Sequence, residues 1–198
     1  QCGVRVQNQA LILTTTDAHT ATYSGPPYVY GVERVGTSCG CVSAQGVAVV
    51  DMGAVWMGRE SFFVYSGGTV QELASDVSDY IYSDINVAQM SKIVAVSNAK
   101  FSEIRWFYPS AESTENNRYV AFNYQENTWT IGQIARTAAA DAGVYRYPIY
   151  ASPTDKKLYE HEVGFNYDTL TPFAETGPII LGTGDNVMSV TQLIPDER

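Results

Sequence analysis

One pentapeptide in the sequence matches a known catalytic motif. Gly36-Thr37-Ser38-Cys39-Gly40 fits G-x-S-x-G, in which a serine nucleophile lies on a sharp turn between a strand and a helix. Here the next ordered stretch is Val47-Ala48-Val49-Val50, an apolar run typical of another strand. The chain has two histidines, and neither has a clear place in the residue order of that hydrolase class. We therefore interpret the pentapeptide as a chance match.

A histidine between two glutamates could hold a metal ion. His161 lies between Glu160 and Glu162. On an extended strand, His161 would face one side and both glutamates the other, so the three could converge on one ion only at a bulge. We interpret this stretch as a solvated or partner-facing strand. The other histidine, His19, is interpreted as a hairpin residue.

Neither the acidic residues nor the cysteines form a metal-binding pattern. Asp76, Asp79 and Asp84 lack the alternating D-x-D-x-D-G spacing of a calcium loop, and are assigned to helix capping and a solvated face. The three cysteines are Cys2, Cys39 and Cys41. This odd number suits neither a disulfide framework nor a structural zinc site, so we expect buried free thiols, assembled in a reducing compartment.

Arginines on several predicted strands could bind an acidic substrate. They are Arg34, Arg59, Arg105 and Arg118. A sialidase-type propeller converges arginines on a substrate carboxylate and adds a tyrosine and an acid pair, for which Glu60 and Glu103 are candidates. The S-x-D-x-G-x-x-W loops of such enzymes are missing, and Ser152-Pro153-Thr154-Asp155 matches that motif only weakly. We therefore favour ion pairs across strands. A carbohydrate-binding or glycan-cleaving propeller that contacts a host surface is the alternative function.

No other catalytic pattern occurs in the sequence. There is no phosphate-binding glycine loop, no Rossmann fingerprint and no redox Cys-x-x-Cys. The sequence therefore predicts a protein that is not an enzyme, with no catalytic, cofactor-binding or metal-binding residues and no cofactor.

The clearest elements lie between Lys100 and Gly132. Glu103–Tyr108, Arg118–Tyr124 and Trp129–Gln133 alternate apolar and polar residues, which predicts a meander of three or four half-buried antiparallel strands. The residues expected on the buried faces are Ile104, Trp106, Tyr108, Val120, Phe122 and Tyr124.

A second four-stranded meander is predicted before the first. Its strands are Val47–Asp51, Ala54–Gly58, Ser61–Tyr65 and Thr69–Leu73, with Gly67-Gly68 as a tight hairpin turn. Further strands are expected between Val4 and Val35, in a hairpin of Pro148–Ala151 with Lys157–Glu162, and at 178–181 and 187–194.

Helix is predicted at few positions. An insertion at about 75–90 holds a helix capped by Ser75 and a second, weaker one through Ala88-Gln89-Met90. The alanine-rich stretch Arg136–Gly143 could hold another short helix. Successive antiparallel sheets of about 40 residues predict an all-β fold, a β-propeller-like array of meanders, with a β-sandwich as the alternative. Residues 1–198 form a single β domain or part of a larger propeller.

Charge and hydropathy limit the partners. The net charge of -9 argues against tight binding of nucleic acid, because phosphate contacts require a basic surface. No apolar run is long enough to span a bilayer, and no signal-peptide pattern opens the sequence. The first residue is Gln1 rather than Met, and the sequence begins in the middle of an apolar pattern. We therefore expect this chain to be a segment of a larger polypeptide.

Two resemblances to known families rest on particular stretches. Arg118–Trp129 resembles the closing strands of a kelch blade, without the diglycine of that repeat, which would imply a protein-interaction module. From about Leu11 to Ile194 the chain resembles the propeller-bearing tail hub or nozzle proteins of short-tailed bacteriophages. The residues that carry this resemblance are Trp56–Tyr65, Phe101–Ser110, Arg118–Trp129 and Arg136–Ala138.

The phage resemblance implies a structural role in the virion. Such proteins form a ring, here expected to be a homohexamer, around the DNA channel below the portal, and they contact other tail, portal and adaptor proteins. The chain would be assembled in the host cytoplasm and would guide or retain DNA without binding it specifically. A negative channel wall suits this role, since it repels phosphate, and aromatic strands suit large permanent interfaces.

Overall fold

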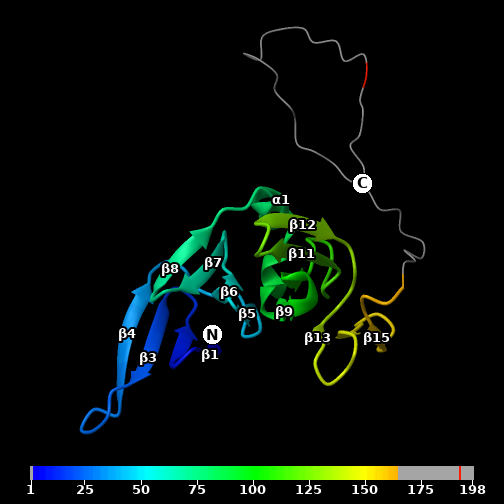
Figure 1. Ribbon diagram of the computed structural model, residues 1–198. Helices are drawn as coiled ribbons and strands as arrows, with labels where there is room; N and C mark the ends of the chain where they lie inside the picture. Colours follow the sequence, from blue (N-terminus) through cyan, green and yellow to red (C-terminus); the bar gives the residue numbers. More distant parts are fainter. Residues whose placement is uncertain (1, 165–191, 193–198) are drawn as a thin grey trace. The chain divides into compact units, whose positions relative to one another are not determined.

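The computed structural model describes residues 2–164 and residue 192 (Figure 1). In these residues the chain is all-β, as predicted, with four antiparallel sheets, one short α-helix and two 3-10 helices. The strands predicted at 178–181 and 187–194 lie outside the described residues. None of the described helices is long and apolar enough to cross a membrane.

Each sheet is a meander whose strands are consecutive in the sequence. The first contains β1 (Cys2–Val6), β2 (Gln9–Leu13), β3 (Ala18–Tyr23) and β4 (Tyr30–Gly36); the second contains β5 (Val47–Val50), β6 (Gly53–Met57), β7 (Phe62–Ser66) and β8 (Thr69–Leu73). The third contains β9 (Val94–Asn98), β10 (Glu103–Tyr108), β11 (Arg118–Asn123) and β12 (Thr128–Gly132), and the fourth contains β13 (Ala138–Ala140), β14 (Ile149–Ala151) and β15 (Leu158–Glu160). Both predicted meanders are therefore present.

The helical insertion differs from its prediction at the start. Helix α1 spans Ser78–Asp84 and follows Val77, which makes no side-chain capping bond, whereas the Oγ of Ser75 accepts only the Val77 N–H at 3.4 Å. Ser75 is therefore not the cap. The second helix is η1 (Val87–Lys92), which begins after Asn86, and η2 spans Ala99–Phe101.

The helix considered for the alanine-rich stretch at 136–143 is wrong. Ala138–Ala140 forms β13, which pairs with β14. Alanine favours a helix only weakly in a short segment, and here the backbone hydrogen bonds of β14 outweigh that preference.

Three apolar clusters fill the spaces between successive sheets. One, around Leu11 and Trp56, lies between the first and second sheets, and one around Phe107 and Tyr150 lies between the third and fourth. The largest lies between the second and third sheets and is covered by α1. It contains Ala48, Val55, Met57, Phe62, Val64, Ile81, Ile85, Ile93, Ile104, Trp106, Tyr108, Val120 and Phe122.

The middle sheets are buried on both faces, which corrects the expectation of half-buried strands. In β10, Trp106 faces the largest cluster while its neighbour Phe107 faces the next cluster, and both are buried. In β6, Val55 and Trp56 divide between two clusters in the same way. A strand packed on both faces carries apolar residues at successive positions, and alternation alone does not show this.

The first strands of the four sheets lie next to one another. Strand β5 contacts β1 on one side and β9 on the other, and β9 also contacts β13. A parallel bridge joins Gln45 to Val94, and the Ala95 N–H donates to the Gln45 carbonyl at 2.7 Å. The indole Nε1 of Trp106 donates to the carbonyl of Gly46 at 3.0 Å, which ties the third sheet to the start of the second.

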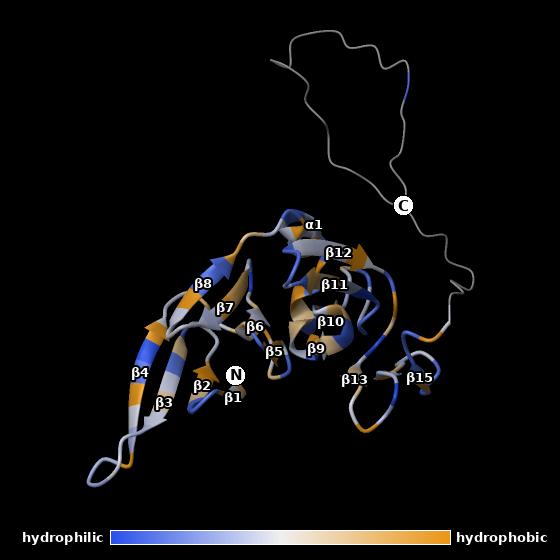
Figure 2. Cartoon of the chain, in the orientation of Figure 1, coloured by the Kyte–Doolittle hydropathy of each residue, from blue (hydrophilic) through white to orange (hydrophobic). Residues whose placement is uncertain are grey.

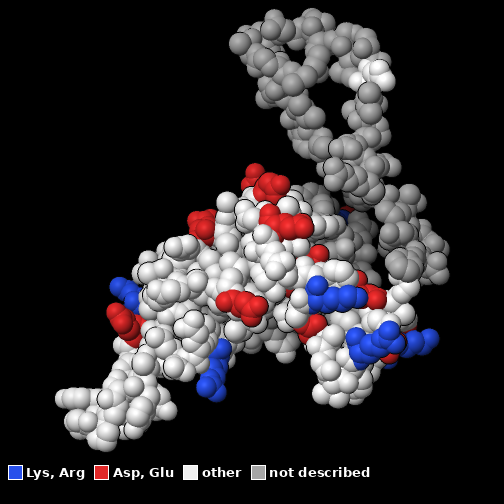
Figure 3. All heavy atoms as spheres, viewed as in Figure 1, with Lys and Arg blue, Asp and Glu red and all other residues white. Residues whose placement is uncertain are grey.

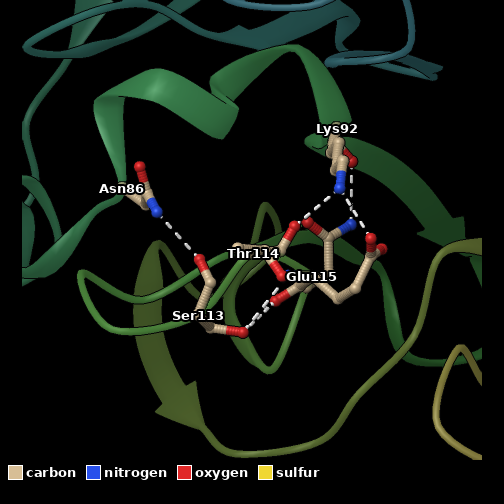
Figure 4. A network of polar contacts seen from close by, with 6 residues as sticks. Asn86, Lys92, Ser113, Thr114 and Glu115 are labelled. Carbon is tan, nitrogen blue, oxygen red and sulfur yellow. Dashed lines mark hydrogen bonds and ion pairs between the residues drawn. The ribbon is translucent and has the colours of Figure 1, made fainter.

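A polar network fixes the loop between β10 and β11 against η1 (Figure 4). The Lys92 ammonium donates to the Thr114 carbonyl at 2.7 Å and to Glu115 Oε1 at 2.6 Å. On the other side of the loop, Asn86 Nδ2 donates to the Ser113 carbonyl at 2.9 Å. The middle of the loop is thus held by Asn86, which precedes η1, and by Lys92, its last residue.

Candidate functional site

A group of partly buried charged and polar side chains surrounds Arg105 on β10. Its Nη2 lies 2.8 Å from Glu103 Oε2 and 2.8 Å from Glu162 Oε1. The three side chains are only 18%, 23% and 22% exposed in the order Arg105, Glu103, Glu162. Glu103 is two residues away on the same strand face, whereas Glu162 comes from the segment after β15. We call these three residues the Arg105 cluster.

Buried polar groups border the Arg105 cluster. Asn98, fully buried, donates through Nδ2 to Glu162 Oε1 at 3.2 Å, and its Oδ1 has no hydrogen-bond partner among the described residues. Tyr150 is also fully buried, and its hydroxyl lies beside Arg105 without a well-directed hydrogen bond. The Arg105 guanidinium also lies over the ring of Tyr119, 6.0 Å from its centroid.

Burial and charge act in opposite directions on the titration of this site. Burial lowers the pKa of Arg105, but Tyr150, Glu103 and Glu162 outweigh it and hold the pKa above its ordinary value. Burial raises the pKa of Tyr150, and Arg105 only partly offsets this. The guanidinium therefore stays charged, and its charge is neutralised by the carboxylates of Glu103 and Glu162.

His161 lies behind Tyr150 and not on a solvated strand. Strand β15 ends at Glu160, and the imidazole of His161 stacks on the Tyr150 ring with centroids 4.1 Å apart. Its Nε2 accepts a hydrogen bond from Arg136 Nε at 2.9 Å. Burial, then Arg136 and Arg105, lower the pKa of His161 to about 4. The interpretation of this stretch as a solvated or partner-facing strand is therefore wrong for His161.

The three residues of the candidate metal stretch point to separate partners. Glu160 is exposed opposite Ile149, His161 binds Arg136, and Glu162 binds Arg105. A positive φ of 61° at Glu162 turns the chain after the strand and directs that carboxylate inward. Within residues 2–164, no group of three or more His, Cys, Asp or Glu side chains could hold a metal ion.

The four candidate arginines lie at four separate places. Arg118 pairs with Asp84 at 2.8 Å, and Arg34 approaches Asp17 at 3.9 Å. Arg59 lies in the loop between β6 and β7. Of the two candidate acids, Glu103 binds Arg105, and Glu60 lines a depression of about 570 Å³ beside Glu72 and Asp79.

The pentapeptide around Ser38 is a packed turn between two strands. It begins at Gly36, the last residue of β4, and leads to β5 without a helix. Gly40 lies so close to the backbone of Thr15 that a side chain there would overlap it. The carbonyl of Cys39 accepts the indole N–H of Trp56 at 2.8 Å. Cys39 and Cys41 are buried free thiols, as predicted, and Cys2 is half-buried. His19 lies within β3, opposite Ile12.

The Arg105 cluster binds two parts of the chain to each other. Glu162 links the end of the fourth sheet to the face of the third sheet that carries Phe107, next to the apolar cluster of Phe107 and Tyr150. The sequence singled out Arg105 and Glu103 as candidates for one site, named Glu162 only in the candidate metal stretch, and gave no indication of Asn98. The i, i+2 spacing of Glu103 and Arg105 was the available signal, because such residues share a strand face. No protein-family model matches the chain, and no curated protein matches it significantly.

Proposed function

We propose that the chain is a structural, non-enzymatic subunit of a short-tailed bacteriophage tail, in the hub or nozzle below the portal. Six copies form a ring around the DNA channel and contact neighbouring tail, portal and adaptor proteins. The resemblance of the stretches Trp56–Tyr65 and Arg118–Trp129 supports this role, and both stretches include strands of the buried meanders.

The arrangement of the first strands is the observation that carries the proposal. β1, β5, β9 and β13 lie next to one another, and apolar clusters separate the successive meanders. Blades of a propeller are arranged in this way around an axis, with short, protected edges. A packed array of this kind suits a structural subunit of a ring.

The neutralised charges also favour a structural role. Arg105 is bound by two carboxylates, and Arg118 by one, so neither presents a free guanidinium to an acidic ligand. The chain carries a net charge of -9, which keeps DNA moving past it without retention. The glycan-cleaving alternative, which needs converging arginines, receives less support from these positions.

Electron microscopy of the purified full chain tests the proposal. We expect closed rings with an open centre, and no retained complex with duplex DNA at physiological salt. Particles of a single copy at every concentration, or tight DNA binding, would contradict it. Glycan-array binding that Arg105→Ala abolishes, without loss of folding, would favour the carbohydrate alternative.

A further inference from the structure

The hairpin of β3 and β4 is uncharged over a long stretch. From Ala18 to Val32 the sequence contains no Asp, Glu, Lys or Arg, in a chain with a net charge of -9. On the face drawn in Figure 3, the projecting lobe at lower left, where Figure 1 places this hairpin, is free of charged side chains. A second acidic molecule can therefore approach this hairpin with little charge repulsion.

Large apolar side chains are exposed on the hairpin. Tyr23, Tyr28 and Tyr30 are 64%, 78% and 65% exposed, and Val32 is 66% exposed. Each aromatic side chain can bury on the order of 150–250 Å², so the three tyrosines, each about two thirds exposed, together offer about 400 Å². That is about half of what each partner buries in an interface of standard size, about 800 Å². We call Tyr23, Tyr28, Val29, Tyr30 and Val32 the hairpin surface.

Strand β4 is also an open edge of its sheet. It pairs with β3 on one side, and no strand of residues 2–164 pairs with its other side. The Ser24 N–H donates to the Val29 carbonyl. Because hydrogen-bonded pairs alternate along antiparallel strands, Gly31 and Glu33 also direct their backbone N–H and C=O groups toward β3. Tyr30, Val32 and Arg34 consequently direct theirs outward. Figure 2 shows the apolar segments along this strand.

We propose that β4 pairs antiparallel with β4 of a second copy of this chain, about a two-fold axis at Val32. The two sheets then form one continuous eight-stranded sheet, and the outward N–H and C=O groups of Tyr30, Val32 and Arg34 become paired. An isologous contact of this kind uses the same patch on both copies. It also removes an exposed edge that would otherwise be a site for aggregation.

The charges on β4 disfavour the neighbouring registers centred on Glu33 and Arg34. A two-fold axis perpendicular to the sheet leaves each side chain on its own face, so the axis must pass through a residue. An axis at Glu33 or at Arg34 would set like charges against each other, which is unfavourable across strands. An axis at Val32 instead places each Arg34 opposite the Tyr30 ring of the other copy, on the same face.

That pairing is chemically complementary. A guanidinium over a tyrosine ring gains cation–π attraction, and the axis supplies two such pairs with two valines between them. Glu33 comes opposite Gly31, so neither acidic side chain meets another. Tyr23, which packs edge-on against Tyr30 with centroids 5.7 Å apart, extends the apolar face on both copies. A second copy is therefore a better fit than an acidic or basic partner.

The inference does not depend on the phage-tail proposal. In a polar ring of six copies, neighbours are related by rotation about the ring axis, so a two-fold pair would join two such rings or two free copies. Loss of the pair with rings still formed would refute only this inference. Pairs without rings would leave it standing and count against the ring.

Complementary charge substitutions at Val32 test the pairing in the full chain. Because the axis sets residue 32 against itself, Val32→Glu and Val32→Lys each place like charges together, and each variant alone should form particles with half the wild-type number of copies. An equal mixture of the two should restore the wild-type particle mass, measured by light scattering coupled to size exclusion. Thermal unfolding of each variant checks that it is folded, as expected at an exposed position.

Each alternative occupant gives a distinct result that overturns the pairing. A mixture that stays at half mass rules out an isologous contact at residue 32. Wild-type chain that remains a single copy but floats with phosphatidylcholine vesicles identifies a membrane surface as the occupant. Val32→Thr is the matched control, since it keeps size and β preference, and should retain the wild-type mass.

Discussion

Arg105 illustrates how a side chain that could bind a substrate is instead used to hold the fold together. Two carboxylates, from Glu103 and Glu162, bind one guanidinium in a site that is about one fifth exposed. Without the guanidinium, these carboxylates would face each other across a poorly hydrated space. The cost of removing Arg105 is therefore larger than the value of either ion pair.

Arg105→Ala should lower the free energy of unfolding by about 2–3 kcal/mol, because it leaves two partly buried carboxylates uncompensated. Arg105→Lys should recover only part of this, since an ammonium cannot reach both carboxylates as a planar fork does. Denaturant unfolding measures both. Arg59→Ala is the control, because Arg59 is exposed in the loop between β6 and β7 and its loss should change stability by less than about 1 kcal/mol. Equal losses at the two arginines would contradict the assignment.

His161 should make the stability of the protein depend on pH. Its pKa is about 4 in the folded chain, below the ordinary 6.5, because it is buried and faces Arg136 and Arg105. The unfolded chain therefore binds the extra proton between pH 6.5 and pH 4. The contribution of His161 is fully present above pH 6.5 and is lost as the pH falls toward 4.

We expect His161→Gln to show a shallower loss of stability over that window than the wild type, while the two differ by a constant amount above pH 7. Unfolding midpoints measured at half-unit pH steps give the comparison. All carboxylates that titrate in the window are present in both proteins, so the difference isolates the imidazole. Parallel curves between pH 6.5 and pH 4 would refute the assignment.

At the scale of the elements, two glycines allow the cost of a strained backbone conformation to be measured separately from the cost of a steric clash. Gly67 adopts a φ of 61° with open space where a Cβ would lie, and Gly53 adopts a φ of 132° directly against the carbonyl of Tyr65. Gly67→Ala should cost about 1 kcal/mol, for the conformation alone. Gly53→Ala adds a steric clash with backbone, and should cost more than about 2 kcal/mol.

Thermal and denaturant unfolding of the two variants provide the measurement. Both residues belong to one meander: Gly67 lies in the β7–β8 turn, and Gly53 is the first residue of β6, directly after the β5–β6 turn. Equal losses would show that the backbone around Gly53 moves to accept a methyl group, against the packing described here.

Alternation of side chains predicted the elements whose buried faces carry large aromatic residues. Trp106 and Phe122 are buried on the predicted face of β10 and β11. The prediction did not name β9, whose Val94-Ala95-Val96 is short and follows a 3-10 helix without a turn signal. Nor could it place Glu162, because a left-handed residue after β15 redirects its side chain, and a glutamate in that conformation has no sequence pattern.

At the scale of the whole molecule, strands that face two clusters couple the sheets. β6 places Val55 and Met57 in the largest cluster, and Ala54 and Trp56 in the cluster around Leu11. β6 cannot unfold from one cluster while it stays packed in the other. We therefore expect residues 2–163 to unfold as one cooperative unit, in which damage to one cluster lowers the stability of its neighbour by the same amount.

Leu11→Ala tests this coupling. Leu11 is fully buried in the cluster between the first and second sheets, so truncating it should lower the free energy of unfolding by about 3 kcal/mol. In a Trp56→Phe background the remaining tryptophans are Trp106 and Trp129, whose rings stack with centroids 6.3 Å apart. Their fluorescence reports on the largest cluster, between the second and third sheets. Their fluorescence midpoint should fall as far as the far-ultraviolet circular dichroism midpoint does. Ile12→Ala, one residue along on the solvent face, should shift both only slightly, and a fluorescence midpoint unmoved by Leu11→Ala would mean that the sheets unfold independently.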